Sequence, residues 1–142
     1  HEVKRRGFLL KVDTNGSNPQ KIEEALSLGL IDYIALDFKA PRQDFELITK
    51  SSLYDKFLQT LRLLLRQNFK FEVRTTVHAD FLNEAKIEQM AQILYSEGYR
   101  SVYYLQNFLP TGDNFGNLNA PLASFDPSKI RTDLKIELRN FD

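Results

Sequence analysis

Short apolar runs alternate along the chain with longer segments of helical periodicity. The apolar runs are rich in β-branched and aromatic residues, which is typical of strands. The four predicted strands are residues 8–13, 32–38, 69–77 and 102–108. Because strands alternate with helices, the pattern predicts parallel βαβ units and an α/β fold. No linker or internal repeat divides the chain, so we expect residues 1–142 to form a single domain.

The segments between these strands repeat apolar residues three and four positions apart, as amphipathic helices do. The predicted helices are residues 19–28, 53–67 and 83–97. Asn18 and Pro19 mark a helix start, because Asn caps free backbone N–H groups and Pro tolerates the first helical position. Gly29 and Gly98 are expected to end the helices that precede them.

Three further segments lie outside this alternation. Residues 2–6 look like the polar end of a helix, and residues 135–138 are expected to form a last short strand. Residues 42–52 are polar and are expected to be irregular. We also expect Asp80, Glu84 and Glu88 to lie at a helix N-terminus, where the helix dipole favours carboxylates.

One face of the predicted sheet is polar. Side chains alternate along a strand, so Ile34, Leu36 and Phe38 share a face that suits packing against helices. The opposite face carries Asp37, Lys39, Glu72, Arg74 and Thr76. A sheet covered by helices on both faces would be apolar on both. We therefore expect about four parallel strands with helices on the outer face only, and a polar face that lines an open concavity.

Two interpretations of this polar face remain open from the residues alone. Half-buried charges need partners, and Asp37 and Lys39 can pair with each other or with Arg74 and Glu72 on the next strand. In that case the residues form an internal salt-bridge network. Alternatively they bind a ligand, because ligands of parallel α/β proteins bind at the carboxyl ends of the strands.

The first predicted strand also ends in polar residues, Asp13-Thr14-Asn15-Gly16. Asn-Gly is a turn dipeptide, so a turn alone explains this segment locally. Since two neighbouring strands each end in an acidic residue, Asp13, Asn15, Asp37 and Lys39 could instead converge on one small polar ligand. His78 is expected to lie in a loop and is not predicted to act as a base.

Composition narrows the function further. The chain carries 19 basic and 19 acidic residues, so it has no charge excess typical of proteins that bind nucleic acid or an anionic membrane. No apolar run is long enough to span a bilayer. The absence of cysteine excludes disulfides, thiolate zinc sites and Fe–S ligands in this chain. We expect a cytoplasmic protein.

Two of these segments together resemble radical S-adenosylmethionine enzymes that activate glycyl radical enzymes. Residues 10–17 contain a D-T-N-G motif and residues 29–41 contain a D-x-K motif. The resemblance is closest to the activating enzymes of anaerobic ribonucleoside-triphosphate reductase and of pyruvate formate-lyase. It extends through much of the chain and weakens beyond Phe108.

The resemblance implies a partial (βα)6 barrel that is open on one side, to which this chain contributes strands three to six and a C-terminal extension. It implies that Asp13 and Asp37 help to hold the amino-acid end of S-adenosylmethionine, in some members through a bound monovalent cation. Lys39 would meet the carboxylate of the cofactor. The full set of implied cofactor-binding residues is Asp13, Thr14, Asn15, Gly16, Asp37, Lys39 and Arg74.

Two motifs of the family are missing from the chain. These are the C-x3-C-x2-C loop that holds the 4Fe–4S cluster and a glycine-rich motif that meets the amino group of the cofactor. Both are expected upstream of His1, so we expect the chain to be the C-terminal part of such an enzyme and to be inactive alone. The parent would act in anaerobic metabolism, cleaving S-adenosylmethionine reductively and generating a glycyl radical on a partner enzyme.

Three further expectations follow. Without the first two strands, the edge at residues 8–13 would be bare and could pair with a second copy, giving a homodimer.

The main alternative function is a small non-radical α/β domain that binds a ligand or a cation. A second alternative is a barrel enzyme with Lys39 as an amine nucleophile, which is disfavoured because Asp37 would keep the ammonium group protonated.

Overall fold

The computed structural model describes residues 2–111 and 116–141, and they form an α/β fold built on one parallel sheet. Its strands follow one another in chain order, and each pairs in parallel with the next. They are β1 (Lys11–Thr14), β2 (Tyr33–Asp37), β3 (Phe71–Val77), β4 (Tyr103–Asn107) and β5 (Ile136–Arg139). The predicted fold class is confirmed, and the last short strand completes a five-stranded sheet.

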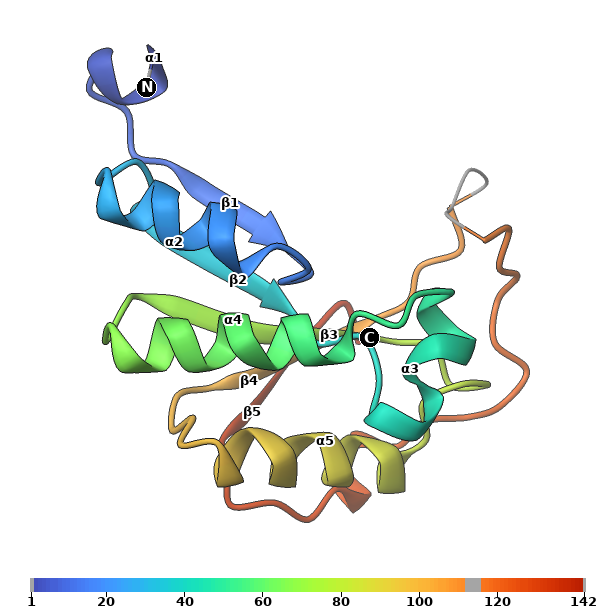
Figure 1. Cartoon of the computed structure of the whole chain (residues 1–142). Coiled ribbons are helices and arrows are strands. Elements are labelled where there is room, and N and C mark those ends of the chain that lie inside the picture. The colour runs from blue at the N-terminus through green and yellow to red at the C-terminus, as the bar shows by residue number, and fades with distance from the viewer. Residues whose placement is uncertain (1, 112–115, 142) are drawn as a thin grey trace.

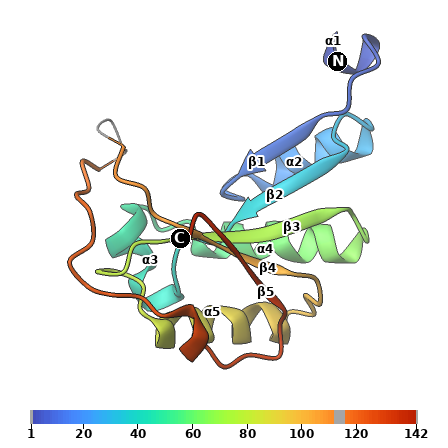
Figure 2. The same ribbon diagram turned by 180° about the vertical axis from the view of Figure 1, so that it is seen from behind.

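The longer helices lie on one face of this sheet. In Figure 1, α2 and α4 lie in front of the strands, and in Figure 2, from behind, the strands lie in front of these helices. The helices are α1 (Glu2–Arg5), α2 (Pro19–Ser27), α3 (Arg42–Thr49), α4 (Tyr54–Arg66) and α5 (Glu84–Ser96), with a short 3-10 helix at Pro127–Lys129. The other face of the sheet is left for polar side chains, as the strand pattern predicted.

Asparagine side chains start two of these helices. The side chain of Asn18 accepts a hydrogen bond from the backbone N–H of Lys21, with Pro19 at the first helical position. Asn83 caps α5 in the same way through the N–H of Lys86. These caps satisfy donors that have no partner inside the helix, and they fix where each helix begins.

The hydrophobic core lies between the sheet and the helices. On the strand side it contains the fully buried side chains of Leu36, Phe38 and Val73, and the aromatic ring of Phe38 stacks on Phe57 of α4 at a centroid distance of 4.4 Å. The apolar stripe of α4 therefore faces the sheet, as its periodicity predicted.

The prediction of an irregular segment at 42–52 is wrong, because residues 42–49 form α3. Phe45 provides the reason, since its buried ring packs edge-on against Tyr54 at 5.4 Å and anchors the helix to α4. Ile48, one turn later, also packs against the core. The helix ends where Lys50 adopts a left-handed conformation, with φ of 56°.

Side chains from both ends of the sheet meet over its uncovered face. Lys11 of β1 and Arg139 of β5 both contact Oε1 of Glu72 on the central strand, at 3.5 and 3.0 Å. β1 and β5 are each two strands away from β3. Their contact with one carboxylate shows that this face is concave. Among the described residues, no helix is long and apolar enough to cross a membrane.

Candidate functional site

A cluster of charged side chains lies on the concave face, near the carboxyl ends of the first three strands. Arg74 of β3 donates through Nε to Oδ1 of Asp37 at 2.5 Å and through a terminal nitrogen to Oδ2 of Asp13 at 2.9 Å. Strand register explains the convergence, because Asp37 lies beside Arg74 and Asp13 lies beside Ala35. One guanidinium group therefore bridges two carboxylates from different strands.

Lys39 extends this cluster beyond the end of β2. Its Nζ lies 3.0 Å from Oδ2 of Asp37, so this carboxylate receives one cation on each oxygen. The side chains of Arg74 and Asp37 are 16% and 20% exposed, whereas that of Asp13 is 55% exposed. The cluster is thus anchored at Arg74 and opens to solvent at Asp13. We call Asp13, Asp37, Lys39 and Arg74 the strand-end cluster.

Electrostatics keep Arg74 charged. Burial alone would lower the pKa of Arg74, but the hydrogen bonds and charges of Asp37 and Asp13 outweigh burial and raise it. The pairs Asp37–Lys39 and Asp37–Arg74 are those expected of an internal salt-bridge network. Glu72 was the other expected partner in that network, but it pairs instead with Arg139, Lys11 and Tyr33.

The segment after Asp13 forms a tight turn. The hydroxyl of Thr14 accepts from the N–H of Gly16, and the side chain of Asn15 accepts from the N–H of Ser17. Gly16 has φ of +71°, and a Cβ there would lie 2.9 Å from a methyl group of Leu36. The backbone of residues 13–16 therefore forms the turn that the Asn-Gly dipeptide indicated. The predicted cofactor contacts of Thr14, Asn15 and Gly16 stay a prediction.

A pocket of about 450 Å³ adjoins the strand-end cluster. Asn15 and Lys39 line it, together with Thr76 at the end of β3 and the rings of Phe45 and Phe108. Two predicted site residues thus face a mostly apolar cavity at the carboxyl end of the sheet, which is where parallel α/β proteins bind ligands.

His78 follows β3 and lies in a loop, as expected, but it is buried beside this pocket. Its Nε2 lies 2.9 Å from the carbonyl oxygen of Asn119, and its ring contacts those of Phe81 and Phe108. Nδ1 is 4.0 Å from the carboxylate of Asp80. Burial of His78 was not predicted, although the aromatic residues that follow it in the sequence are the signal that could have indicated it.

The placement of Asp80, Glu84 and Glu88 at a helix N-terminus is correct only for Glu84, in the first turn of α5. Their carboxylates instead accept backbone N–H groups of a distant segment. Asp80 binds the amides of residues 122 and 123, Glu84 that of residue 126, and Glu88 that of residue 131. Hydrogen bonding to these amides lowers the pKa of Asp80 and of Glu84.

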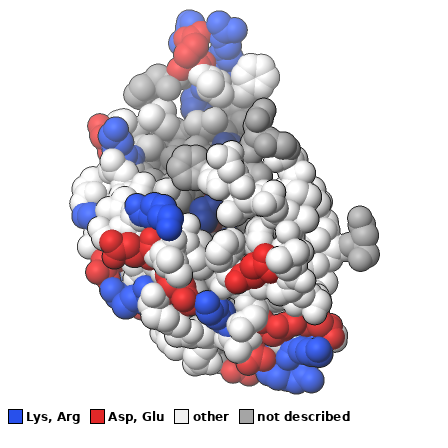
Figure 3. All heavy atoms as spheres, turned by 90° about the vertical axis from the view of Figure 1, so that its right-hand side faces the viewer, with Lys and Arg blue, Asp and Glu red and all other residues white. Residues whose placement is uncertain are grey.

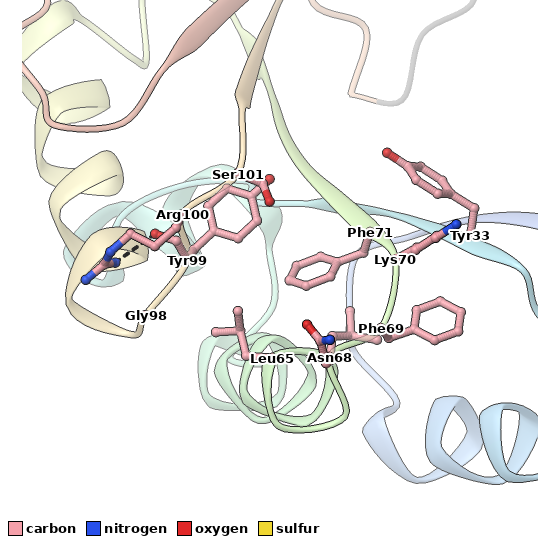
Figure 4. Close-up of a pocket in the computed structure, with 11 residues that line it drawn as sticks. Tyr33, Leu65, Asn68, Phe69, Lys70, Phe71, Gly98, Tyr99, Arg100 and Ser101 are labelled. Carbon is pink, nitrogen blue, oxygen red and sulfur yellow. Dashed lines mark hydrogen bonds between the residues drawn. The ribbon is translucent and has the colours of Figure 1, made fainter.

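A second cavity, of about 510 Å³, lies at the opposite end of the strands. Figure 4 shows the rings of Phe71 and Tyr99 beside it, with Lys70 and Arg100 at its margin. Arg100 is engaged locally, because it donates to the carbonyl oxygens of Tyr95 and Tyr99. None of the predicted site residues lines this cavity.

Two observations limit the chemistry of the described residues. Within residues 2–111 and 116–141, no group of three or more His, Cys, Asp or Glu side chains is placed to hold a metal ion. On the side toward which the strands run in Figure 1, acidic and basic side chains lie next to one another (Figure 3). On the concave face the acidic side chains are likewise paired with basic ones, as in Asp37 with Lys39 and Arg74, and Glu72 with Arg139.

Comparison with known proteins places this geometry in context. No family model matches the sequence. Over 113 residues, the sequence is 32% identical to a protein of Methanocaldococcus jannaschii named "putative glycyl-radical enzyme activating enzyme". The chain is similar to a glycyl-radical enzyme activating enzyme. The aligned part covers 76% of this chain and 46% of the relative, so the chain spans about half the length of the curated relative it matches.

This similarity supports the resemblance seen in the D-T-N-G and D-x-K segments, at the level of the family. Asp13 of the first motif and both Asp37 and Lys39 of the second lie in the strand-end cluster. The two motifs that carry the resemblance therefore meet in space, although Asp13 and Asp37 are 24 positions apart in the sequence.

Proposed function

We propose that this chain is the S-adenosylmethionine-binding part of a radical enzyme that activates a glycyl radical enzyme. The observation that carries the proposal is the bridge formed by Arg74 between Asp13 and Asp37. It joins three strands near their carboxyl ends, which is where parallel α/β proteins bind ligands. The similarity to a glycyl-radical enzyme activating enzyme supports the choice of ligand.

The chemistry of the cluster fits the amino-acid end of this cofactor. That end carries an ammonium group and a carboxylate, and the strand-end cluster contains two carboxylates and two cations. Asp13 is the more exposed carboxylate and is suited to receive the ammonium group, directly or through a monovalent cation shared with Asp37. Lys39 and Arg74 would then bind the carboxylate by charge-assisted hydrogen bonds.

The adjoining pocket suits the rest of the ligand. A nucleoside needs apolar walls with a few polar groups, and the pocket offers aromatic rings beside Asn15, Thr76 and Lys39. The role of this chain is therefore to bind and orient S-adenosylmethionine and to balance its charges. The cofactor itself supplies the radical chemistry when it is reduced.

A 4Fe–4S cluster does not fit the residues of this chain, which contains no cysteine. In our proposal the cluster is held by thiolates outside these 142 residues, and the chain alone does not cleave S-adenosylmethionine. The partner would be a glycyl radical enzyme of the anaerobic ribonucleotide reductase or pyruvate formate-lyase type, in the cytoplasm. We further propose that isolated chains dimerise through the edge of β1, where Phe8 and Leu9 are exposed.

Calorimetry of the 142-residue chain with S-adenosylmethionine tests the proposed function. We expect saturable binding that is weakened at least tenfold in Asp37→Asn, because loss of a charged hydrogen-bond partner costs about 1.5–3 kcal/mol. Asp133→Asn is the matched control, since Asp133 is exposed and lies just before β5, away from the cluster. Equal binding by the two variants, or no binding by the wild-type chain, would contradict the proposal.

The same titration separates the proposal from a domain that binds only a small cation. Methionine and adenosine are compared as competing ligands, and sodium or potassium chloride is varied at constant ionic strength. A response to the cation without binding of S-adenosylmethionine would favour the non-radical alternative.

A further inference from the structure

A second group of charges lies on the concave face, beside the strand-end cluster and closer to the amino ends of the strands. Its centre is Glu72 of β3, whose side chain is only 6% exposed. Arg139 donates to both oxygens of Glu72, at 3.0 and 2.9 Å, and Tyr33 donates to one of them at 3.2 Å. A buried carboxylate needs such partners, so this contact with Arg139 satisfies a charge inside the fold.

Arg139 is held in place for this contact. It belongs to β5 and lies beside Gln106 in the sheet. Its guanidinium carbon lies 3.7 Å from the centre of the Tyr104 ring, so the planar group rests on an aromatic surface. The bidentate hydrogen bonds to Glu72 complete the arrangement, and Glu72 raises the pKa of Arg139.

Glu72 and Arg74 are neighbours on the same face of the same strand. They are two residues apart, and successive residues of a strand point to opposite faces. Each would therefore be a natural ion-pair partner for the other. The structure instead pairs Glu72 with Arg139 and Arg74 with Asp13 and Asp37.

Lys11 is a weaker partner for Glu72 than Arg139 is. It contacts Glu72 at 3.5 Å through a single nitrogen, and its side chain is 49% exposed. A contact of this length and exposure is weak compared with a bidentate guanidinium pair. We therefore expect that, without Arg139, the guanidinium of Arg74 turns toward the buried charge of Glu72, because it lies two residues away on the same face of β3.

We propose that Arg139 is a positioning residue that neutralises Glu72 and so keeps Arg74 directed at Asp13, Asp37 and the ligand. The last strand of the sheet thereby controls a cluster formed by the first three strands. The ligand part of this inference rests on the proposed function, whereas the placement of Arg74 does not depend on it.

The first test observes Arg74 without a ligand. Nitrogen-15 NMR of the Arg74 Nε–H group reports its hydrogen bond to Asp37, and Arg74→Lys assigns the signal. In Arg139→Gln we expect the Nε–H signal to shift and its exchange with solvent to speed up. In the double variant Glu72→Gln with Arg139→Gln we expect both properties to return to the wild-type values. Arg66→Gln is the control, because Arg66 is exposed on α4.

The outcomes of this test are distinct. An unchanged Arg74 signal in folded Arg139→Gln overturns the inference, and so does a shift that the double variant does not reverse. A signal change caused only by unfolding would not return to the wild-type values when Glu72→Gln is added. If Arg139→Gln does not fold, Arg139→Lys is measured instead, since it keeps the charge and loses the bidentate contact; the same shift is expected, smaller in size.

The second test uses the ligand. We expect Arg139→Gln to weaken binding of S-adenosylmethionine about tenfold, because a charge-assisted contact of Arg74 is lost, and the double variant to restore it. Decarboxylated S-adenosylmethionine, which lacks the group that Arg74 would bind, should lose much less affinity. If the wild-type chain binds neither compound, the proposed function fails while the NMR test still decides the role of Arg139. If both compounds lose affinity equally, the inference is wrong.

Discussion

Arg74 and Asp37 lie opposite each other at paired positions of neighbouring parallel strands, with Nε of the arginine 2.5 Å from Oδ1 of the aspartate. The other arm of the same guanidinium reaches Asp13 on the next strand. Arg74 thus holds two carboxylates close together on the concave face, and neither of them is completely buried.

The Arg74–Asp37 pair should contribute to stability as well as to binding. We expect Asp37→Asn to lower the free energy of unfolding by about 1–2 kcal/mol, since the pair is partly buried and hydrogen-bonded. Urea unfolding measures the change. Asp55→Asn breaks a second Arg–Asp pair, that of Arg42 and Asp55, whose side chains are 59% and 69% exposed. That control should change stability little, and a larger loss there than at Asp37 would contradict this assignment.

Gly16 should be the least replaceable glycine among the described residues with positive φ. Gly16→Ala adds a Cβ 2.9 Å from Leu36 and 3.3 Å from the backbone of Phe57, besides the strain of φ at +71°. Gly29 has a similar φ of +62° but no atom within 4 Å of the added Cβ. Gly29→Ala should therefore cost only the conformational strain, about 1–2 kcal/mol.

Gly16→Ala should cost about 1–3 kcal/mol more than Gly29→Ala, because overpacking adds to the strain. It should also disturb the hydrogen bond of 2.8 Å that the Thr60 hydroxyl donates to the carbonyl oxygen of Gly16. Thermal or urea unfolding of both variants gives the comparison. Equal losses would show that contact with α4 does not restrict this position.

The contact between Asp80 and the segment at residues 122–123 should be lost in acid. Hydrogen bonds from the amides of Ala123 and Leu122 lower the pKa of Asp80 below its ordinary value of 3.8. A lowered pKa means that the contact is fully present above pH 3.8 and is lost as the pH falls through the lower folded value. The amide chemical shift of Ala123 should report this step in an NMR titration.

Asp80→Asn provides the control for that titration, because it removes the ionisable group and keeps the side-chain shape. We expect the acid step of the Ala123 amide to disappear in this variant. A step that persists unchanged would mean that another group controls the segment.

The exposed edge of β1 should mediate self-association. Leu9, just before β1, is 83% exposed, and we expect Leu9→Lys to weaken dimerisation, as measured by light scattering over a range of concentrations. Leu122→Lys is the matched control, since Leu122 is 97% exposed on a different part of the chain. A wild-type chain that is monomeric at all concentrations would rule out this interface.

Local sequence signals were sufficient for most of the sheet and its helices. The cap at Asn18, the start of a helix near residue 83 and the stripe of α4 depend on residues close in sequence, so the pattern alone predicts them. The helix at 42–49 was missed because its two core residues, Phe45 and Ile48, occupy little more than one turn. A polar segment with one short apolar pair gives a weak periodic signal.

The candidate site was predictable only in part, because some of its contacts join residues that are far apart in the sequence. Alternation placed Asp37 and Arg74 on one face, and parallel topology placed Asp13 beside them. The pairing of Glu72 with Arg139 was not predictable, because the two residues are 67 positions apart and β5 carries no motif. The same holds for Asp80, whose partners at 122 and 123 lie in another segment.

The central claim is that the strand-end cluster binds the amino-acid end of S-adenosylmethionine, and an NMR titration of the nitrogen-15-labelled chain tests it most directly. The account predicts that the largest shifts occur at residues 13–16 and 37–39 and at the Nε–H of Arg74, and that they saturate. Shifts confined to residues 68–71 and 98–101 around the cavity at the amino ends of the strands, or no shifts at all, would contradict it.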